Sequence, residues 1–231
     1  MSDLQAFLNK VSSLTSPPVV VKLPSTGNNI NITPLNIVQQ KKLLTDGITN
    51  EYELIGFTKT LNEIISEEVP DARLSDRSYL SIILRSISID KQFDGIDLTK
   101  LTDNSKWLSD IAKSATFSIG DLTIAIEMPF LRDEIKFLDY LKSNLTDDEE
   151  YNTRLIYSLE VLKYIKTLTL DGEILNLSDL DIKTRLSVFD KLPIVCTKDI
   201  VSYIESFKNA EADLLTIDDT TLVIDREFFS V

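Results

Sequence analysis

The chain has 231 residues, 43% of them hydrophobic and 26% charged, with a net charge of −13 and no histidine. Such a composition is ordinary for a globular protein, and the negative charge opposes binding to a nucleic-acid backbone as the main activity. Without histidine and with one cysteine, Cys196, the chain cannot form a Ser-His-Asp triad, a Cys-His pair, a structural zinc site or an internal disulfide. Its six glycines are too far apart for a GxGxxG motif or a P-loop.

The sequence gives no sign of a membrane segment. Apolar runs such as VVV at 19–21 are too short to span a bilayer, and the first ten residues lack the pattern of a signal peptide. We therefore expect a soluble cytosolic protein whose single thiol stays reduced. The charge is uneven, because residues 1–50 carry a net charge of +2 and the remainder carries −15.

Residues 3–14 are predicted to form a short amphipathic helix. Two consecutive prolines, at 17 and 18, separate this segment from the rest of the chain. We interpret residues 1–16 as an arm that either docks on a neighbouring subunit or covers its own domain. The partner-binding stripe would consist of Leu4, Phe7, Leu8, Val11 and Leu14.

The next segment is predicted to be a hairpin followed by a helix. The β-branched run at 19–21, a PSTGN turn and the alternating INI favour the hairpin. Thr33 is a suitable N-cap and Pro34 suits the first helical position, so a helix is expected from 34 to Asp46. Its apolar residues do not form one narrow stripe. The helix is therefore either buried on more than one side or in contact with something else.

Apolar periodicity and turn residues predict the elements of the remaining chain. Helices are expected at 52–66, 76–89 with Ser75 as cap, 104–115, 129–143, 149–164 with a Thr146–Glu149 capping box, 178–191 and 198–209. Hairpins are expected at 115–126 around Gly120-Asp121, around Asp171-Gly172, and at 213–229.

These elements together predict an α+β fold that is predominantly helical with several short β-hairpins. We expect an amphipathic N-terminal arm at 1–16 and a region of hairpins and helices at 17–127. An acidic helical region with a terminal hairpin follows at 128–231, either as a separate unit or as one continuous domain with 17–127.

No residue pattern predicts a catalytic, cofactor-binding or metal-binding site. The segment DKQFDGIDLTKL (90–101) superficially resembles a calcium loop, but Asp97 stands where an apolar residue is needed and Leu101 where the bidentate glutamate belongs. Cys196 follows an apolar PIV and has no partner base, which favours a buried structural thiol. Among the 37 acidic residues, nothing singles out a catalytic pair.

Two segments resemble a known family. LPSTGNNINITPLNIVQQKKLL (23–44) is similar to the N-terminal signature of a baseplate protein family of T4-like contractile-tailed phages. RLSDRSYLSIILRSISI (73–89) resembles the family's second signature, with an Asp, a Tyr-Leu pair, an Arg and a following Ser. Some members carry cysteine pairs after the second signature, and this chain has the 115–126 hairpin there instead.

The resemblance implies a non-enzymatic hub component or hub-assembly factor of a phage tail baseplate, with other hub proteins as partners. It would act in the host cytoplasm during assembly, and the resemblance leaves open whether it stays in the virion. The alternative is an acidic phage regulatory module that sequesters a host or phage protein. A third class, an enzyme with carboxylate or lysine chemistry, has no motif in its favour.

Overall fold

The computed structural model describes residue 7 and residues 17–46, 53–107 and 114–230. Most of the described chain is helical. The α-helices are α2 (Ile37–Thr45), α3 (Glu53–Glu68), α4 (Arg77–Ser88), α5 (Asn104–Trp107), α6 (Leu131–Asn144), α7 (Glu149–Leu162), α8 (Ile182–Phe189) and α9 (Val195–Leu214). Short 3-10 turns lie at η1 (Leu74–Asp76), η2 (Leu98–Leu101), η3 (Leu177–Asp179) and η4 (Glu227–Phe229).

The strands form small antiparallel sheets, which confirms the predicted α+β class with helices predominant. Two-stranded hairpins are formed by β1 (Val19–Lys22) with β2 (Asn29–Ile32), β3 (Gln92–Phe93) with β4 (Ile96–Asp97), and β9 (Thr216–Ile217) with β10 (Thr220–Thr221). One four-stranded sheet has the order β5 (Ala115–Ile119), β6 (Leu122–Ile126), β7 (Ile165–Leu170), β8 (Glu173–Asn176).

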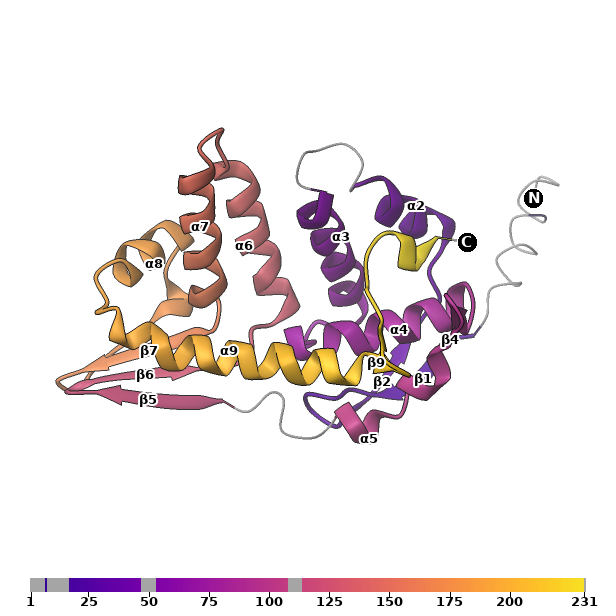
Figure 1. Ribbon diagram of the computed structural model, residues 1–231, viewed down its shortest axis with the longest axis horizontal. Coiled ribbons are helices and arrows are strands. Elements are labelled where there is room, and N and C mark those ends of the chain that lie inside the picture. The colour runs from indigo at the N-terminus through magenta and orange to yellow at the C-terminus, as the bar shows by residue number, and fades with distance from the viewer. Residues whose placement is uncertain (1–6, 8–16, 47–52, 108–113, 231) are drawn as a thin grey trace.

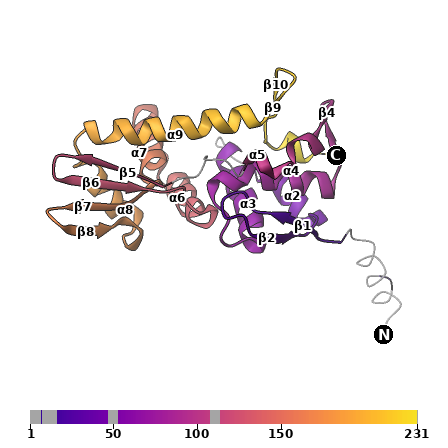
Figure 2. The ribbon, with the colours of Figure 1, turned by 90° about the horizontal axis from the view of Figure 1, so that it is seen from below.

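The elements are distributed along one long axis (Figure 1). The four-stranded sheet lies at one end with α7 and α8 above it, and the β1–β2 hairpin lies with α2, α3 and α4 towards the other end. Helix α9 runs along this axis and reaches both groups, as the view from below also shows (Figure 2). Helix α6 packs beside α3 between them.

The four-stranded sheet joins two predicted hairpins. Its β7–β8 turn places Asp171 and Gly172 at φ +52° and +83°, a left-handed pair that favours Asp-Gly. Both predicted hairpins are confirmed, and β6 then pairs with β7, with Leu122 opposite Leu170. Since the chain between β6 and β7 contains α6 and α7, this pairing is not visible in local sequence.

Helix α2 begins three residues later than predicted. Asn36, and not Thr33, is the N-cap, and it forms a reciprocal capping box with Gln39 at 2.9 and 3.0 Å. The backbone N–H of Thr33 instead donates to Glu68 at 2.8 Å, and that of Leu35 donates to Ser88 at 2.8 Å. These tertiary bonds hold residues 33–36 outside the helix, so Pro34 is not at the first helical position.

Two other predicted caps are wrong. Ser75 lies inside the 3-10 turn before α4, and Asp76 occupies the N-cap position without capping the helix through its side chain. At α7 the cap is Asp148, whose carboxylate accepts from the backbone N–H groups of Glu150 and Tyr151 at 3.0 Å. Thr146 instead accepts from the N–H of Asp148, which fixes the turn before the helix.

Several predicted boundaries also change. Of the helix predicted at 104–115, residues 104–107 are helical, 108–113 lie outside the described residues and Ala115 begins β5. Helix α6 starts at 131, since the carbonyl of Pro129 accepts a bond from Leu74 at 2.8 Å. Helix α8 is shorter than predicted, and α9 is longer at 20 residues.

The predicted hairpin at 213–229 shrinks to the four paired residues of β9 and β10. The segment after β10 runs to η4 and buries Leu222, Phe228 and Phe229 in the core. Burying aromatic rings contributes more to stability than extending a short exposed hairpin would. None of the described helices is long and apolar enough to cross a membrane.

The new cap assignment leads to a stability prediction. Asn36→Ala removes the side-chain acceptor of the α2 N-terminus and should lower the free energy of unfolding by about 1 kcal/mol. Thr33→Ala is the matched control, because its backbone bond to Glu68 survives the substitution. It should change stability by less than about 0.5 kcal/mol. Urea denaturation of both variants measures the difference, and a larger loss for Thr33→Ala would restore Thr33 as the cap.

Candidate functional site

The turn of the β1–β2 hairpin is bound to the start of α4 through one buried carboxylate. Ser25 donates to Asp76 from its backbone N–H at 2.7 Å and from its hydroxyl at 2.6 Å. The N–H of Arg73 adds a third bond at 2.8 Å, and Asp76 is fully buried. Burial raises the pKa of Asp76, and the bonds from Ser25 and Arg73 act in the opposite direction.

The segment between β2 and α2 is fixed by the ends of two other helices. Glu68, at the end of α3, accepts from Thr33, and Ser88, at the end of α4, accepts from Leu35. Further along, Lys42 pairs with Glu63 of α3 at 2.7 Å. Helix α2 is therefore a positioned surface element.

Arg85 of α4 holds the C-terminal segment against this unit. Its guanidinium donates to the carbonyl of Phe228 and, at 3.0 Å, to that of Ser230. The same group lies over the rings of Phe93 and Phe228, at 4.6 and 5.3 Å from their centroids. Gln40 of α2 adds a bond to the carbonyl of Phe229 at 3.1 Å. The hairpin, α2, α4 and the C-terminal segment thus form one connected unit.

Helix α2 presents apolar side chains to solvent. Leu43 is fully buried, whereas Ile37 and Val38 are 70% and 75% exposed. This exposure contradicts burial of the helix on several sides, and its contact with something else stays a prediction. Adjacent exposed β-branched residues on a fixed helix are suited to contact with a partner protein.

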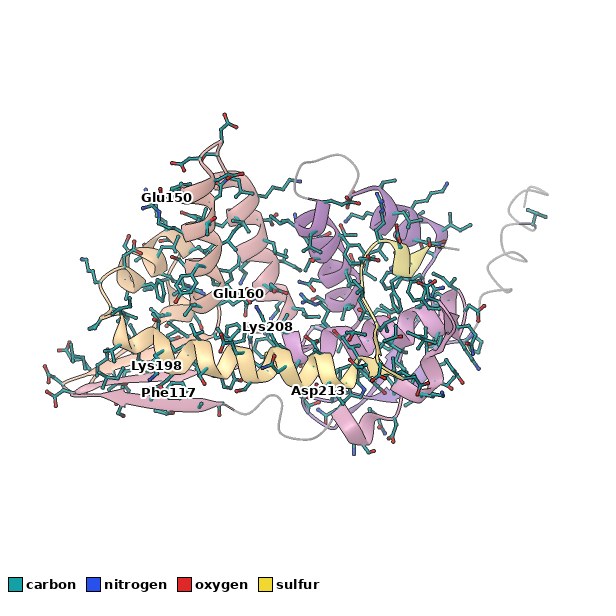
Figure 3. All side chains as sticks on the ribbon, in the orientation of Figure 1. Phe117, Glu150, Glu160, Lys198, Lys208 and Asp213 are labelled. Atoms are coloured by element: carbon teal, nitrogen blue, oxygen red, sulfur yellow. The ribbon has the colours of Figure 1, made fainter. Side chains whose placement is uncertain are left out.

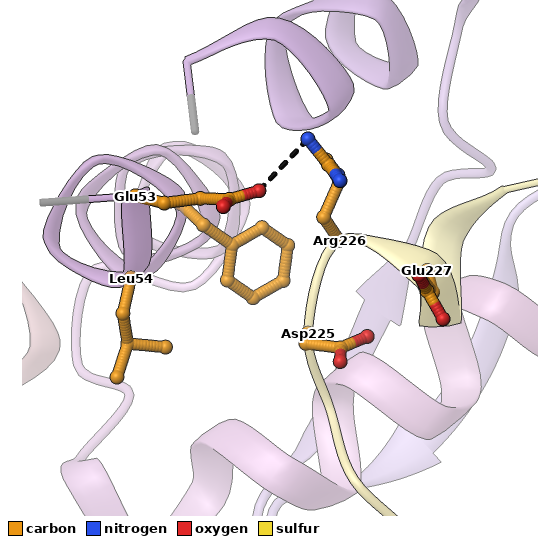
Figure 4. A pocket seen from close by; sticks show the side chains of 6 residues that line it. Glu53, Leu54, Asp225, Arg226 and Glu227 are labelled. Atoms are coloured by element: carbon orange, nitrogen blue, oxygen red, sulfur yellow. Dashed lines mark ion pairs between the residues drawn. The ribbon is translucent and has the colours of Figure 1, made fainter. Parts of the chain in front are cut away.

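A pocket of about 320 Å³ opens beside the C-terminal segment (Figure 4). It lies between the start of α3 and the residues before η4, and Arg226 pairs with Glu53 across it at 2.8 Å. Leu54 at its edge is 68% exposed. The lining residues are Glu53, Leu54, Phe57, Asp225, Arg226 and Glu227. Two of its four charged side chains, Glu53 and Arg226, are paired with each other, and Asp225 accepts a hydrogen bond from the backbone N–H of Phe228.

A cluster of charged side chains around the buried Glu134 joins five of the described helices. Glu134 of α6 accepts from Asn62 of α3, Arg77 of α4 and Lys163 at the end of α7, each at 2.8 Å. Lys163 also pairs with Glu160 at 2.7 Å, and Glu160 pairs with Lys208 of α9 at 2.9 Å. Figure 3 labels Glu160 and Lys208 where α7 and α9 face each other.

The electrostatics of this cluster make it unsuited to proton transfer near neutrality. Burial acts to raise the pKa of Glu134, but Arg77, Lys163 and the hydrogen bonds outweigh it and lower the pKa from 4.5 to about 2. Burial acts to lower the pKa of Lys163, and Glu134 and Glu160 more than reverse this, so its pKa is raised. A general acid or a nucleophilic lysine needs a pKa close to the working pH, so we interpret the cluster as structural.

The predicted partner-binding stripe lies almost entirely outside the described residues. Its described member, Phe7, is 62% exposed. The other four residues, Leu4, Leu8, Val11 and Leu14, lie outside the described part of the chain.

The sequence-based interpretation of Cys196 agrees with the structure. The side chain is fully buried, and burial raises the pKa of the thiol, which disfavours the reactive thiolate. In the calcium-like segment, Asp94 and Gly95 form the turn between β3 and β4. Asp97 accepts two bonds from Thr99, so its carboxylate is engaged locally. Among the described residues, no three His, Cys, Asp or Glu side chains are placed to hold a metal ion.

The family resemblance included Asp76 and Arg85 as signature residues, but sequence reasoning did not predict their contacts, and it did not single out Glu134. A charged residue directly after the apolar run at 82–84 was the available signal that Arg85 lies near the core. Glu134 has no comparable signal, because Asp133 beside it is acidic as well and is not buried.

Comparison with known proteins gives no relative: no protein-family model matches the chain, and no curated protein or solved structure is significantly similar to it.

The ionic cluster predicts a specific pH dependence. Glu134→Gln keeps the shape but removes the charge that compensates Arg77 and Lys163, and should cost about 3 kcal/mol of unfolding free energy at neutral pH. Because the folded-state pKa is depressed, this stabilisation is complete above pH 4.5 and is lost as the pH falls towards about 2. Urea unfolding at several pH values should show the two proteins converging over that interval.

Glu150→Gln is the matched control for this experiment. Its side chain is 82% exposed and forms a 3.7 Å pair with Arg154, so its stability should stay within about 0.5 kcal/mol of the parent. A difference between Glu134→Gln and the parent that persists unchanged at low pH would contradict the assigned role of the Glu134 charge.

The interpretation of the 90–101 segment as a plain turn predicts that calcium has no effect on stability. Neither EDTA nor added calcium should shift the melting temperature, because Asp97 is bonded within its own turn and position twelve is Leu101. Differential scanning calorimetry with and without chelator measures this. A fall of several degrees in EDTA would reveal a metal site.

Proposed function

We propose that this chain is a non-enzymatic structural or assembly component of a contractile-tail phage baseplate hub, acting through protein–protein contacts. The observation that carries the proposal is the bonding between the two segments that resemble the family signatures. Ser25 of the first segment and Asp76 of the second, 51 residues apart, are joined by two short hydrogen bonds. Leu35 and Ser88 join the same two segments again.

This bonding supports the resemblance because the two short motifs contact each other and stabilise one unit of the fold. The buried carboxylate of Asp76 needs the hydrogen bonds from Ser25 in the hairpin turn. Without Ser25, this buried polar group would lose two of its donors. Arg85, also in the second segment, anchors the C-terminal segment to the same unit. The signature residues thus build a platform, and α2 displays Ile37 and Val38 from it.

The chemistry of the described residues also favours a binding role over an enzymatic one. The buried carboxylate Glu134 and the buried amine of Lys163 are held in ion pairs, with pKa values displaced away from neutrality. Cys196 is buried. The features left for function are exposed apolar side chains on fixed elements, which are typical of protein contact surfaces.

The proposal predicts that a double substitution on α2 weakens partner binding without unfolding the chain. Ile37→Asp with Val38→Asp places two charges in the proposed contact and should reduce co-purification with a hub protein from phage-infected cells by about tenfold or more. The melting temperature should change little, because both side chains are exposed. Ile156→Asp on α7, where the side chain is 46% exposed, is the matched control and should retain the partner.

Mass spectrometry of the co-purified proteins decides between the two binding roles. Baseplate hub proteins as the α2-dependent partners would support the proposal. A single host protein, captured through the same residues with no baseplate protein present, would contradict it and favour the sequestering module.

A further inference from the structure

Two tyrosine hydroxyls are buried without a hydrogen-bond partner in the core between α7 and α9. Tyr164 directly follows Lys163 at the end of α7 and is fully buried, and Tyr203 belongs to α9. Their rings pack edge to face, with centroids 6.1 Å apart. Neither hydroxyl has a hydrogen-bond partner within the described part of the chain. An unpaired buried hydroxyl is costly, so these two atoms require an explanation.

Both hydroxyls lie near charged groups. Burial raises the pKa of the Tyr164 hydroxyl, and the carboxylates of Glu160 and Glu134 raise it further. Burial likewise raises the pKa of Tyr203, whose hydroxyl also interacts with the carboxylate of Glu127. Each hydroxyl is therefore close enough to a carboxylate to interact with its charge, yet neither donates to one directly.

The neighbouring acceptors have unused capacity. Glu134 accepts three hydrogen bonds, and a carboxylate can accept about four. Glu160 pairs with Lys163 through one oxygen and with Lys208 through the other, so each oxygen has capacity for a second bond. Asn62 is fully buried and donates to Glu134, but its own carbonyl oxygen is unpaired. A small molecule that both donates and accepts can connect the hydroxyls to these acceptors.

A small cavity beside Tyr164 provides space for such a molecule. Its volume is about 50 Å³, and its lining includes Lys163, Tyr164 and Glu127, the carboxylate that acts on Tyr203. One water molecule needs about 10–15 Å³ by this measure and two to four polar partners. The cavity therefore has room for one or a few waters and is too small for a metabolite.

We propose that ordered internal water binds in the core between the end of α7 and α9, bonded to the hydroxyls of Tyr164 and Tyr203 and donating to the neighbouring carboxylates. Water suits this site because it both donates and accepts hydrogen bonds. The site would join α9 to the cluster around Glu134, where the direct pair through Lys208 is partly exposed. The assignment does not rest on the proposed hub function, because the site is internal.

Tyrosine-to-phenylalanine substitutions test the proposal, because bonded and unpaired hydroxyls predict different results. If water is bonded to both hydroxyls, Tyr164→Phe and Tyr203→Phe should each lower the melting temperature by about 2–4 °C, the effect of one lost hydrogen bond. Removal of an unpaired hydroxyl would leave the melting temperature unchanged or raise it, and either result would overturn the proposal. Tyr157→Phe on α7, where the side chain is 49% exposed, is the matched control and should melt like the parent.

The double variant and a high-resolution crystal structure identify the water itself. If both hydroxyls share one water site, Tyr164→Phe combined with Tyr203→Phe should lower the melting temperature by less than the sum of the two single losses. Fully additive losses would contradict a shared site. The crystal structure of the parent should show a water about 2.5–3.0 Å from the Tyr164 hydroxyl. A Tyr164 hydroxyl that bonds directly to a carboxylate, with no water beside it, would overturn the proposal even if the melting temperatures fall.

Discussion

The arrangement of the helices depends on a single buried carboxylate. Glu134 is 4% exposed and is bound by groups from α3, α4 and the end of α7, while it stands itself on α6. Lys163 also pairs with Glu160, and Glu160 pairs with Lys208 of α9. A buried charge is costly unless every partner is in place, so Glu134 restricts the relative positions of α3, α4, α6 and the end of α7. The pair with α9 is weaker, because Lys208 is 55% exposed.

A second constraint ties the end of the described chain to its beginning. Phe228 and Phe229 are fully buried, Phe229 packs against Phe57 of α3, and Arg85 binds the carbonyl of Phe228. The predicted division at 127/128 stays a prediction, but several contacts cross it. Leu74 bonds to Pro129, and Leu131 bonds to Ala72, at 2.8 and 2.9 Å. The C-terminal segment therefore completes the core of the region that contains the two signature-like segments.

Local signals predicted the elements well, and long-range bonds decided the details. The Asp171-Gly172 turn and the apolar periodicity of α3 and α4 are properties of a few neighbouring residues, so the sequence reveals them. Thr33 and Asn36 are both good caps, and the choice between them is made by Glu68, 35 residues from Thr33, and by Ser88. The same limit applies to the site. The sequence shows that the apolar residues of α2 do not form one stripe, which is a local property. The burial of Glu134 depends on groups from α3, α4 and the end of α7, so local sequence does not reveal it.

The net charge of −13 limits how copies of this chain can associate. Copies of an acidic protein repel one another, and this repulsion suppresses unspecific association. Specific contact therefore has to come from places where apolar side chains are exposed and the local charge is favourable. Exposed apolar side chains of this kind lie, among other places, on the Ile37–Val38 face of α2 and in the groove beside β8, at Leu170 and Leu175. Because the buried charges are paired within the core, the elements that carry these side chains are held in a fixed geometry.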